Sequence, residues 1–269
     1  MAYKIVFSDV DGTLLDSAHR LSPGTLYAIG ALRERGIPFV IVSARSPSGI
    51  YPIQEEYGFR CPVISYSGGL LLDENRNVLH SDGFSAETAR QVIRYIEERR
   101  FDCTWNLYCG DTWIVRDRRD PRVRREEEIV RARAAEGTPE SLPDGTEVGK
   151  ILCMCRPECL SDIERQLQAA FPALSVVRSS EILLEIMQKG VSKGNAVRTF
   201  CQMHHILPEE AVAFGDHYND VAMLEAVGMP YLMGNAPQAL KDRFPNVTDS
   251  NDDDGICHAL TELGLVPRR

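Results

Sequence analysis

The sequence contains no apolar run long enough to cross a membrane. Its first apolar stretch, residues 5–7, is interrupted almost at once by Asp9 and Asp11, and no later stretch approaches ~20 consecutive apolar residues. A secretory signal also needs a longer, uncharged apolar segment. The sequence therefore predicts a soluble cytoplasmic protein with no membrane partner.

The sequence also lacks the cysteine spacing that is typical of metal or disulfide sites. Its cysteines are scattered without a C-x-x-C pair, and no histidine follows the group at 153–159 at zinc-finger spacing. Reduced, mostly buried thiols are therefore favoured over a metal site or a disulfide framework. The eight cysteines are Cys61, Cys103, Cys109, Cys153, Cys155, Cys159, Cys201 and Cys257.

Positive charge is scarce as well. The 269 residues include 30 Lys and Arg against 39 Asp and Glu, a net charge of −9, and 43% are hydrophobic. This composition excludes a disordered chain, a collagen-like repeat and a disulfide-stapled miniprotein. A net negative chain binds phosphate backbones poorly, so nucleic acid is not an expected partner. No sustained heptad repeat is evident, and the sequence indicates no oligomeric state.

The N-terminal third alternates short apolar runs with a helical pattern. Residues 5–7, 39–42 and 63–66 are β-rich runs of buried-strand length, and residues 22–35 between the first two form a helix candidate. Ser22-Pro23 provides its N-cap and first turn, and Gly36 its end. This β-α-β order predicts a parallel sheet covered on both faces.

The same order resumes near the C-terminus, with helices at 192–204, 219–227 and 236–243 and strands at 211–214 and 231–233. Between the two portions the pattern is α+β. It has helices at 85–99 and 160–171, a hairpin at 103–115, and strands at 150–155, 175–177 and 183–185. We therefore predict a discontinuous α/β core of residues 1–82 and 190–269 with an α+β insert at 83–189. The acidic segment 249–254 is expected to be a solvated loop.

A pair of carboxylates follows the first predicted strand directly. Asp9 and Asp11 flank one residue, and Gly12 permits a tight turn that can turn backbone N–H groups toward an anion. Ligands of open parallel sheets bind beyond the carboxyl ends of the strands, so this position suits chemistry. A pair of capping or turn aspartates is the alternative interpretation.

A second polar cluster, residues 215–220, follows the strand at 211–214. Alone it could be a helix cap, but with the first cluster it supplies hard oxygen ligands that suit Mg²⁺ better than Zn²⁺. Ser43 and Arg45 follow another strand, and Lys193 begins a helix. A hydroxyl, cations, carboxylates and a metal around one point are the components of phosphoryl transfer.

These residues resemble the four motifs of the haloacid dehalogenase superfamily of phosphohydrolases. The insert between the second and third motifs is similar to the α+β cap of its Cof-like, class IIB branch, which implies a Rossmann-like parallel-sheet core and an inserted cap domain. The resemblance extends to residues 233–236 and 247–256. The motifs are Asp9-Val10-Asp11-Gly12-Thr13-Leu14, Ser43, Lys193 and Gly215-Asp216-x-x-Asn219-Asp220.

The resemblance implies a role for each motif residue. Asp9 would be the nucleophile that forms an aspartyl-phosphate, and Asp11 would be the general acid and base, with its backbone carbonyl on the metal. Asp216 would ligate Mg²⁺ directly, with Asn219 and Asp220 in or near the outer shell. The resulting metal set is Asp9, Asp11, Asp216 and Asp220.

The same resemblance implies a phosphate-binding set. Ser43 and Lys193 would bind the phosphoryl oxygens, and Asn235 would support that site. Gly12, Arg45 and Asn219 complete the predicted substrate-binding residues.

Two positions depart from the family pattern. Ser43-Ala44-Arg45 stands where the family commonly has Thr-Gly-Arg, and the hydroxyl is kept. Ser67 stands in place of the usual Asn of Asn-Gly-Ala, and its hydroxyl is a weaker substitute for an amide.

Two further clusters have a structural and a functional interpretation. The arginine-rich segment 116–133 is expected to form a solvated cap helix laced with salt bridges, with a binding surface for anions as the alternative. His204, His205 and His217 raise the possibility of a metal site, but adjacent histidines diverge on a helix.

Together these observations predict a Mg²⁺-dependent phosphomonoester hydrolase acting on a small phosphorylated metabolite, a sugar phosphate in the first instance. A phosphomutase with the same Asp9 chemistry and a non-catalytic sensor of a phosphorylated ligand are the alternatives. The presence of both Asp9 and Asp11 argues against the sensor, because a binding protein has no need of a general acid.

Overall fold

The computed structural model describes residues 3–268 and divides into two compact units. The core unit comprises the residues up to Ala44, Ile53–Leu79 and the residues from Ser192 onward, and the insert unit comprises Arg45–Pro52 and His80–Val191. The division into separate domains at residues 83 and 189 stays a prediction. Among the described residues, no helix combines the length and apolarity that a membrane span requires.

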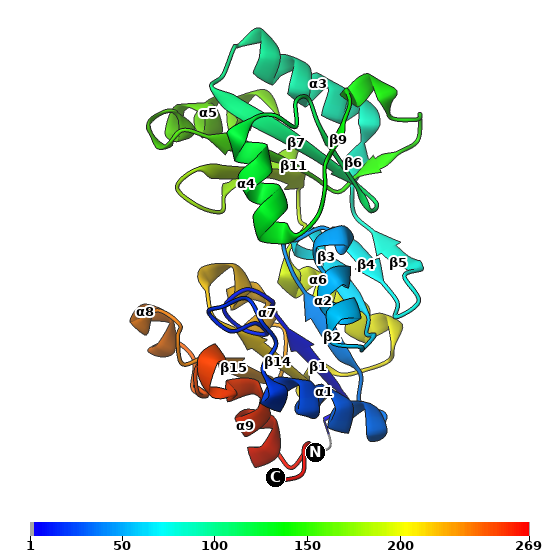
Figure 1. Ribbon diagram of the computed structural model, residues 1–269, viewed down its shortest axis with the longest axis vertical. Helices are drawn as coiled ribbons and strands as arrows, with labels where there is room; N and C mark the ends of the chain where they lie inside the picture. Colours follow the sequence, from blue (N-terminus) through cyan, green and yellow to red (C-terminus); the bar gives the residue numbers. More distant parts are fainter. Residues whose placement is uncertain (1–2, 269) are drawn as a thin grey trace. The chain divides into compact units, whose positions relative to one another are not determined.

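The core unit is built on a largely parallel sheet with the strand order β15-β14-β1-β2-β3-β4-β5 (Figure 1). Neighbouring strands from β15 to β3 run parallel, and β4 pairs antiparallel with β3. The strands are β1 (Ile5–Ser8), β2 (Phe39–Val42), β3 (Val63–Ser65), β4 (Leu70–Leu72), β5 (Val78–Ser81), β14 (Ala211–Gly215) and β15 (Met229–Leu232).

The central strands β1, β2 and β14 are buried along their whole length, as expected of strands covered on both faces. One face packs its apolar side chains against helices α6, α7 and α8, and helices α1 and α9 pack against each other. The helices of the core unit are α1 (Pro23–Glu34), α6 (Lys193–Met203), α7 (Val221–Leu224), α8 (Gln238–Lys241) and α9 (Gly255–Glu262), and α2 (Tyr51–Glu56) spans the boundary of the two units.

Helix α1 confirms the predicted capping, because the Ser22 hydroxyl accepts a hydrogen bond from the Thr25 N–H. The helices predicted at 219–227 and 236–243 are wrong in length, since α7 and α8 have four residues each. A 3₁₀ turn precedes α7, where the Asp220 carboxylate accepts from two backbone N–H groups, and Pro237 immediately precedes α8.

The insert unit has a six-stranded sheet in the order β12-β13-β11-β7-β8-β9, antiparallel except for the last pair. Helices α3 (Ala86–Glu98) and α5 (Pro157–Ala170) pack apolar side chains against it. The α+β pattern is therefore confirmed. The strands are β7 (Cys103–Cys109), β8 (Thr112–Val115), β9 (Ala135–Glu136), β11 (Lys150–Cys155), β12 (Leu174–Arg178) and β13 (Leu183–Gln188), and β6 (Phe84–Ser85) pairs with β10 (Glu147–Val148).

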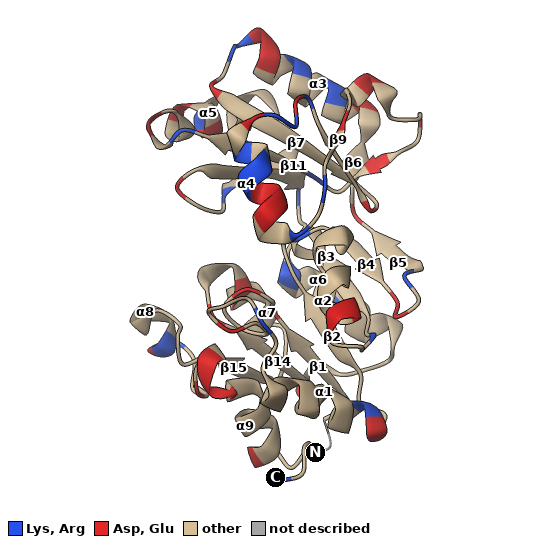
Figure 2. Cartoon of the chain, in the orientation of Figure 1, with Lys and Arg blue, Asp and Glu red and all other residues tan. Residues whose placement is uncertain are grey.

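The arginine-rich segment contains helix α4 (Pro121–Val130), on which a basic stretch is followed by an acidic one (Figure 2). Arg118 pairs with Glu127 at 3.0 Å, and the Arg122 guanidinium lies 2.8 Å from the Asp120 carboxylate. Several of its arginines are thus engaged by neighbouring carboxylates, which confirms the interpretation as a helix laced with salt bridges.

Candidate active site

The buried ammonium of Lys193 joins two carboxylates that come from different strand ends. Its Nζ lies 2.5 Å from Asp9 Oδ1 and 2.6 Å from Asp220 Oδ1, and all three side chains are at most 8% exposed. Asp9 follows β1, Asp220 follows β14, and Lys193 is the first residue of α6. The parallel pairing of β1 with β14 brings the two clusters predicted from the sequence to one edge of the sheet.

Asp220 also organises the turn that carries Asp216. Its Oδ2 accepts hydrogen bonds from the backbone N–H groups of Asp216 at 3.0 Å and His217 at 3.1 Å. The Thr13 hydroxyl donates to Asp216 Oδ1 at 3.0 Å, so a residue of the first motif orients a carboxylate of the last. With both oxygens of Asp220 accepting hydrogen bonds, Asp9 and Asp216 are the better placed carboxylates for direct contact with a ligand.

The environment shifts the pKa values of this cluster upward. Burial and the neighbouring Asp220 raise the pKa of Asp9 to about 8, against the opposing effect of Lys193. Burial and Asp220 likewise raise the pKa of Asp216 to about 6. Burial disfavours the Lys193 ammonium, but Asp220 and Asp9 outweigh burial and raise its pKa. The cluster therefore carries more negative charge than its one lysine neutralises.

A divalent cation fits this donor set. Carboxylate oxygens of Asp9, Asp216 and Asp220 all lie within 4.8 Å of one another. Hard oxygen donors with an excess of buried negative charge are the environment in which Mg²⁺ binds to proteins. A cation there would relieve the repulsion that raises the pKa of Asp9 and Asp216.

Gly12 is required by close packing against Asp216. Its φ is +81°, in the left-handed region, and a Cβ at this position would lie 2.8 Å from the Asp216 Cγ. Any other residue would therefore strain the backbone and displace a carboxylate of the cluster.

We expect Gly12→Ala to lower the free energy of unfolding by about 1–3 kcal/mol and to weaken Mg²⁺ binding, because its methyl group displaces Asp216. Urea unfolding and calorimetric Mg²⁺ titration measure the two effects. Gly30→Ala, within α1 and with no heavy atom within 4 Å of the added Cβ, is the matched control and should be neutral or stabilising. Equal behaviour of the two variants would contradict this role of Gly12.

Comparison with known proteins identifies the fold. The family model of haloacid dehalogenase-like hydrolases matches residues 6–260. The chain belongs to this family. The sequence-based resemblance is confirmed, as is the α/β core with a parallel sheet.

Relatives extend over the whole length of this hydrolase. A Haemophilus influenzae protein that is named as a candidate phosphatase is 35% identical over 262 residues. The match covers 97% of this chain and 98% of that protein. The pyridoxal phosphate phosphatase YbhA of Escherichia coli is 27% identical over 274 residues, covering 97% and 98%. The solved structure of the subclass IIB sugar phosphatase BT4131 has a TM-score of 0.81 at 20% identity and covers 98% of this chain and 100% of its own, so it shares the fold.

The remaining predicted residues of the hydrolase differ in their placement. Ser43 is buried at the end of β2, and its carbonyl accepts from the Ser67 N–H at 2.9 Å. Asn235 Nδ2 donates to the Gly12 carbonyl at 2.8 Å, and Asn219 is exposed in the turn before α7. Arg45 belongs to the insert unit, where its Nη1 donates to the Gly49 carbonyl at 3.1 Å.

Asp11 is more exposed than the carboxylates of the cluster. Its side chain is 48% exposed, and its Oδ1 is 4.0 Å from His19 Nδ1. Its carboxylate is not one of the three clustered around Lys193, in keeping with a predicted metal contact through its backbone carbonyl rather than its side chain.

Two contributors to the site have no assigned role in the sequence analysis. Thr13 belongs to the first motif, but its hydrogen bond to Asp216 joins positions 203 residues apart, and no local sequence pattern predicts it. Gly194 lets α6 approach α7, since a Cβ there would lie 2.6 Å from the Ala222 carbonyl carbon, and this approach places Lys193 beside Asp220. A glycine directly after a helix-starting lysine is the only hint that the sequence offers.

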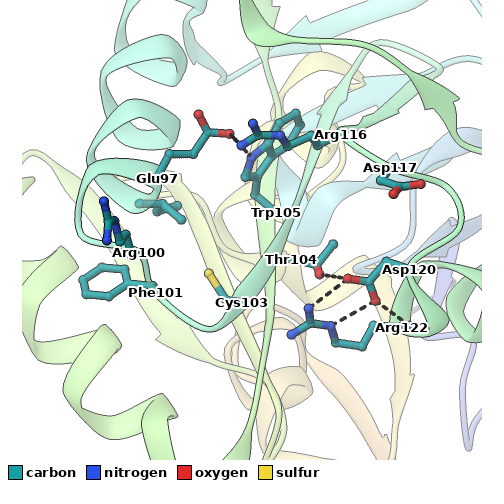
Figure 3. A pocket seen from close by; sticks show the side chains of 11 residues that line it. Glu97, Arg100, Phe101, Cys103, Thr104, Trp105, Arg116, Asp117, Asp120 and Arg122 are labelled. Atoms are coloured by element: carbon teal, nitrogen blue, oxygen red, sulfur yellow. Dashed lines mark hydrogen bonds and ion pairs between the residues drawn. The ribbon is translucent and has the colours of Figure 1, made fainter.

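A separate cavity of about 300 Å³ lies within the insert unit, between α3, β7 and the segment before α4 (Figure 3). Two of its carboxylates accept hydrogen bonds from side chains that also line it. Glu97 accepts from Trp105 and Arg116, and Asp120 accepts from Thr104 and Arg122. None of the site residues predicted from the sequence lines this cavity.

Proposed function

We propose that this hydrolase is a Mg²⁺-dependent phosphatase that removes the phosphoryl group from a small phosphorylated metabolite through an aspartyl-phosphate on Asp9. The observation that carries the proposal is the buried contact of Lys193 with Asp9 and Asp220, beside Asp216. Phosphoryl transfer depends chiefly on positioning and on neutralising charge, and this cluster supplies both.

In this mechanism the Asp9 carboxylate attacks the phosphorus and the bond to the leaving alkoxide breaks. Asp11 donates a proton to that alkoxide and then takes one from the water that hydrolyses the aspartyl-phosphate. Its exposed carboxylate can meet both the leaving group and water. Lys193 keeps Asp9 oriented by its hydrogen bond and offers positive charge to the phosphoryl oxygens.

Mg²⁺, when bound, would neutralise charge on the phosphoryl group and on the attacking carboxylate. Asp9 and Asp216 would hold it with their side chains and Asp11 with its carbonyl, while Asp220 would orient Asp216. Ser43, Gly12 and Asn219 would contribute to phosphate binding, and Asn235 would support them.

We further propose that the insert, residues 83–189, acts as a cap that selects the leaving group, and that Arg45 binds the substrate. A sugar phosphate or a similar small metabolite is the proposed substrate class, and the name of the Escherichia coli relative supports a phosphorylated metabolite. None of the eight cysteines forms a disulfide, which is in keeping with the proposed cytoplasmic location.

The raised pKa values predict a stability that depends on pH and on Mg²⁺. A carboxyl whose pKa is higher in the folded than in the unfolded state stabilises the fold at low pH, and this stabilisation is lost as the pH rises through the folded pKa. With Asp216 near 6 and Asp9 near 8, unfolding free energy without Mg²⁺ should fall by at least about 2 kcal/mol between about pH 5 and 8.

Urea unfolding at both pH values, with and without Mg²⁺, measures this effect. Mg²⁺ binds the ionised carboxylates and should therefore stabilise the protein more at pH 8 than at pH 5. The double variant Asp9→Asn/Asp216→Asn is the control and should flatten both dependences. A larger Mg²⁺ effect at pH 5 would contradict the assignment.

A panel of phosphorylated metabolites, assayed with Mg²⁺ and with a chelator, tests the proposed function. Release of inorganic phosphate from at least one monoester, lost in chelator, is the expected result. Activity only in the presence of a bisphosphate would instead identify a phosphomutase. Saturable binding of phosphorylated ligands without any turnover would contradict the hydrolase and favour the sensor.

A further inference from the structure

The acidic segment 249–254, expected to be a solvated loop, is bonded to the loop that follows β1. Asn251 Nδ2 donates to the Leu15 carbonyl at 2.8 Å, and the Asn251 N–H donates to Asn235 Oδ1 at 3.2 Å. Asn235 in turn donates to the Gly12 carbonyl at 2.8 Å. One pair of asparagines therefore holds two carbonyl groups on either side of a single turn.

Further contacts join the same two segments. The Ser17 N–H donates to Asp252 Oδ1 at 2.8 Å, and the Ser22 hydroxyl bonds Asp254. The acidic segment thus contacts the loop directly at three residues, Leu15 through Asn251 and Ser17 and Ser22 through its aspartates, and it reaches Gly12 only through Asn235.

The loop after β1 needs such support because it has little regular structure of its own. Between β1 and α1 its β-type pairings are isolated bridges, from Asp11 to Leu15 and from Leu15 to Leu21. The turn that Asn235 and Asn251 hold begins immediately after Asp11. A shift of the Gly12 or Leu15 carbonyl would therefore move the Asp11 carboxylate.

We propose that Asn251, with Asn235, is a positioning residue that fixes the turn after Asp11 and so aims the Asp11 carboxyl at the leaving-group oxygen. The inference rests on the proposed function of Asp11 as a general acid. An amide suits this role because it can donate and accept at once. Each asparagine donates from its Nδ2 to a backbone carbonyl group, and Asn235 also accepts the Asn251 N–H with its Oδ1. Displacements of about 1 Å in such positioning can cost about 100-fold in rate.

The test compares two classes of phosphomonoester. An alkyl phosphate needs its leaving group protonated, whereas an aryl phosphate with an acidic phenol leaves without much help. We expect Asn251→Ala to lower kcat/KM for the alkyl phosphate by about 10–100-fold and for the aryl phosphate by less than about threefold. Asn251→Gln, which keeps the donor amide, should recover part of the loss.

Asp253→Asn is the matched control, because the Asp253 carboxylate accepts from Ser250 within the same segment. It should leave kcat/KM for both substrates unchanged. An equal loss for both substrates in Asn251→Ala, or no loss for either, would overturn the inference. Absence of wild-type activity toward every phosphomonoester would instead contradict the proposed function.

Hydrogen exchange tests the positioning independently of activity. The N–H groups of Thr13, Leu14 and Leu15 are hydrogen-bonded to the backbone of Asp9 and Val10. Asn251→Ala should accelerate their exchange by about tenfold or more while leaving β14 unchanged. Unchanged exchange in this turn would overturn the inference, whatever the assays show.

Discussion

Asp9→Asn is expected to lower the turnover of phosphomonoesters by at least about 10⁴-fold, because it removes the nucleophile and leaves no group to form the aspartyl-phosphate. The amide is nearly isosteric with the carboxylate, so the buried site should stay filled. Lys193 keeps its second partner, Asp220, at 2.6 Å. Steady-state phosphate release with saturating Mg²⁺ measures the loss.

Two controls separate this loss from unfolding. Asp242→Asn, an exposed change directly after α8 in the same unit, should retain full turnover. Urea unfolding of Asp9→Asn should show a stability at pH 8 without Mg²⁺ that is no lower than that of the wild type, since a raised pKa means that the Asp9 charge opposes folding. Turnover within about tenfold of wild type would rule out Asp9 as the nucleophile.

Lys193→Met is expected to cost about 3–5 kcal/mol of stability at pH 8 without Mg²⁺. The substitution leaves Asp9 and Asp220 buried with no ammonium between them, and an uncompensated buried charge is strongly destabilising. The loss should be smaller at pH 5. With a pKa of about 8, Asp9 is already protonated at pH 5, so at that pH Lys193 compensates one charge fewer.

Urea unfolding at both pH values measures this cost. Lys189→Met, an exposed lysine of the same chain, is the matched control and should change stability by less than about 0.5 kcal/mol. Adding Asp220→Asn to Lys193→Met should restore part of the stability, because it removes one of the two unpaired charges. A cost equal to that of Lys189→Met would contradict the account of the buried cluster.

Much of the fold follows from patterns that the sequence displays locally. Strand β11 has the bounds predicted for it, helix α1 begins at its predicted serine cap, and α3 lies within its predicted range 85–99. Each of these elements has a clear apolar pattern, and each of the two helices also has a serine cap. Strand β4 was not predicted, because three leucines after a glycine turn fit a strand and a helix equally well.

The candidate site could be predicted in composition but not in geometry. The apolar runs before Asp9 and Asp216 predict that both residues lie at strand ends. The hydrogen bond from Thr13 to Asp216 depends instead on β1 and β14 being neighbours in the sheet. The bond from Asn251 to Leu15 spans 236 residues and replaces a predicted solvated loop. Side-chain contacts at such distances along the chain leave no periodicity to detect.

Trapping the phosphorylated enzyme tests the central claim most directly. Asp11→Asn should slow hydrolysis of the aspartyl-phosphate, because it removes the base that activates water, so the intermediate should accumulate with Mg²⁺ and an aryl phosphate. Acid quenching, digestion and mass spectrometry should then locate one phosphoryl group on Asp9, absent when Asp9→Asn is added. Phosphorylation of another residue, or turnover with no phosphorylated enzyme at any time, would contradict the account.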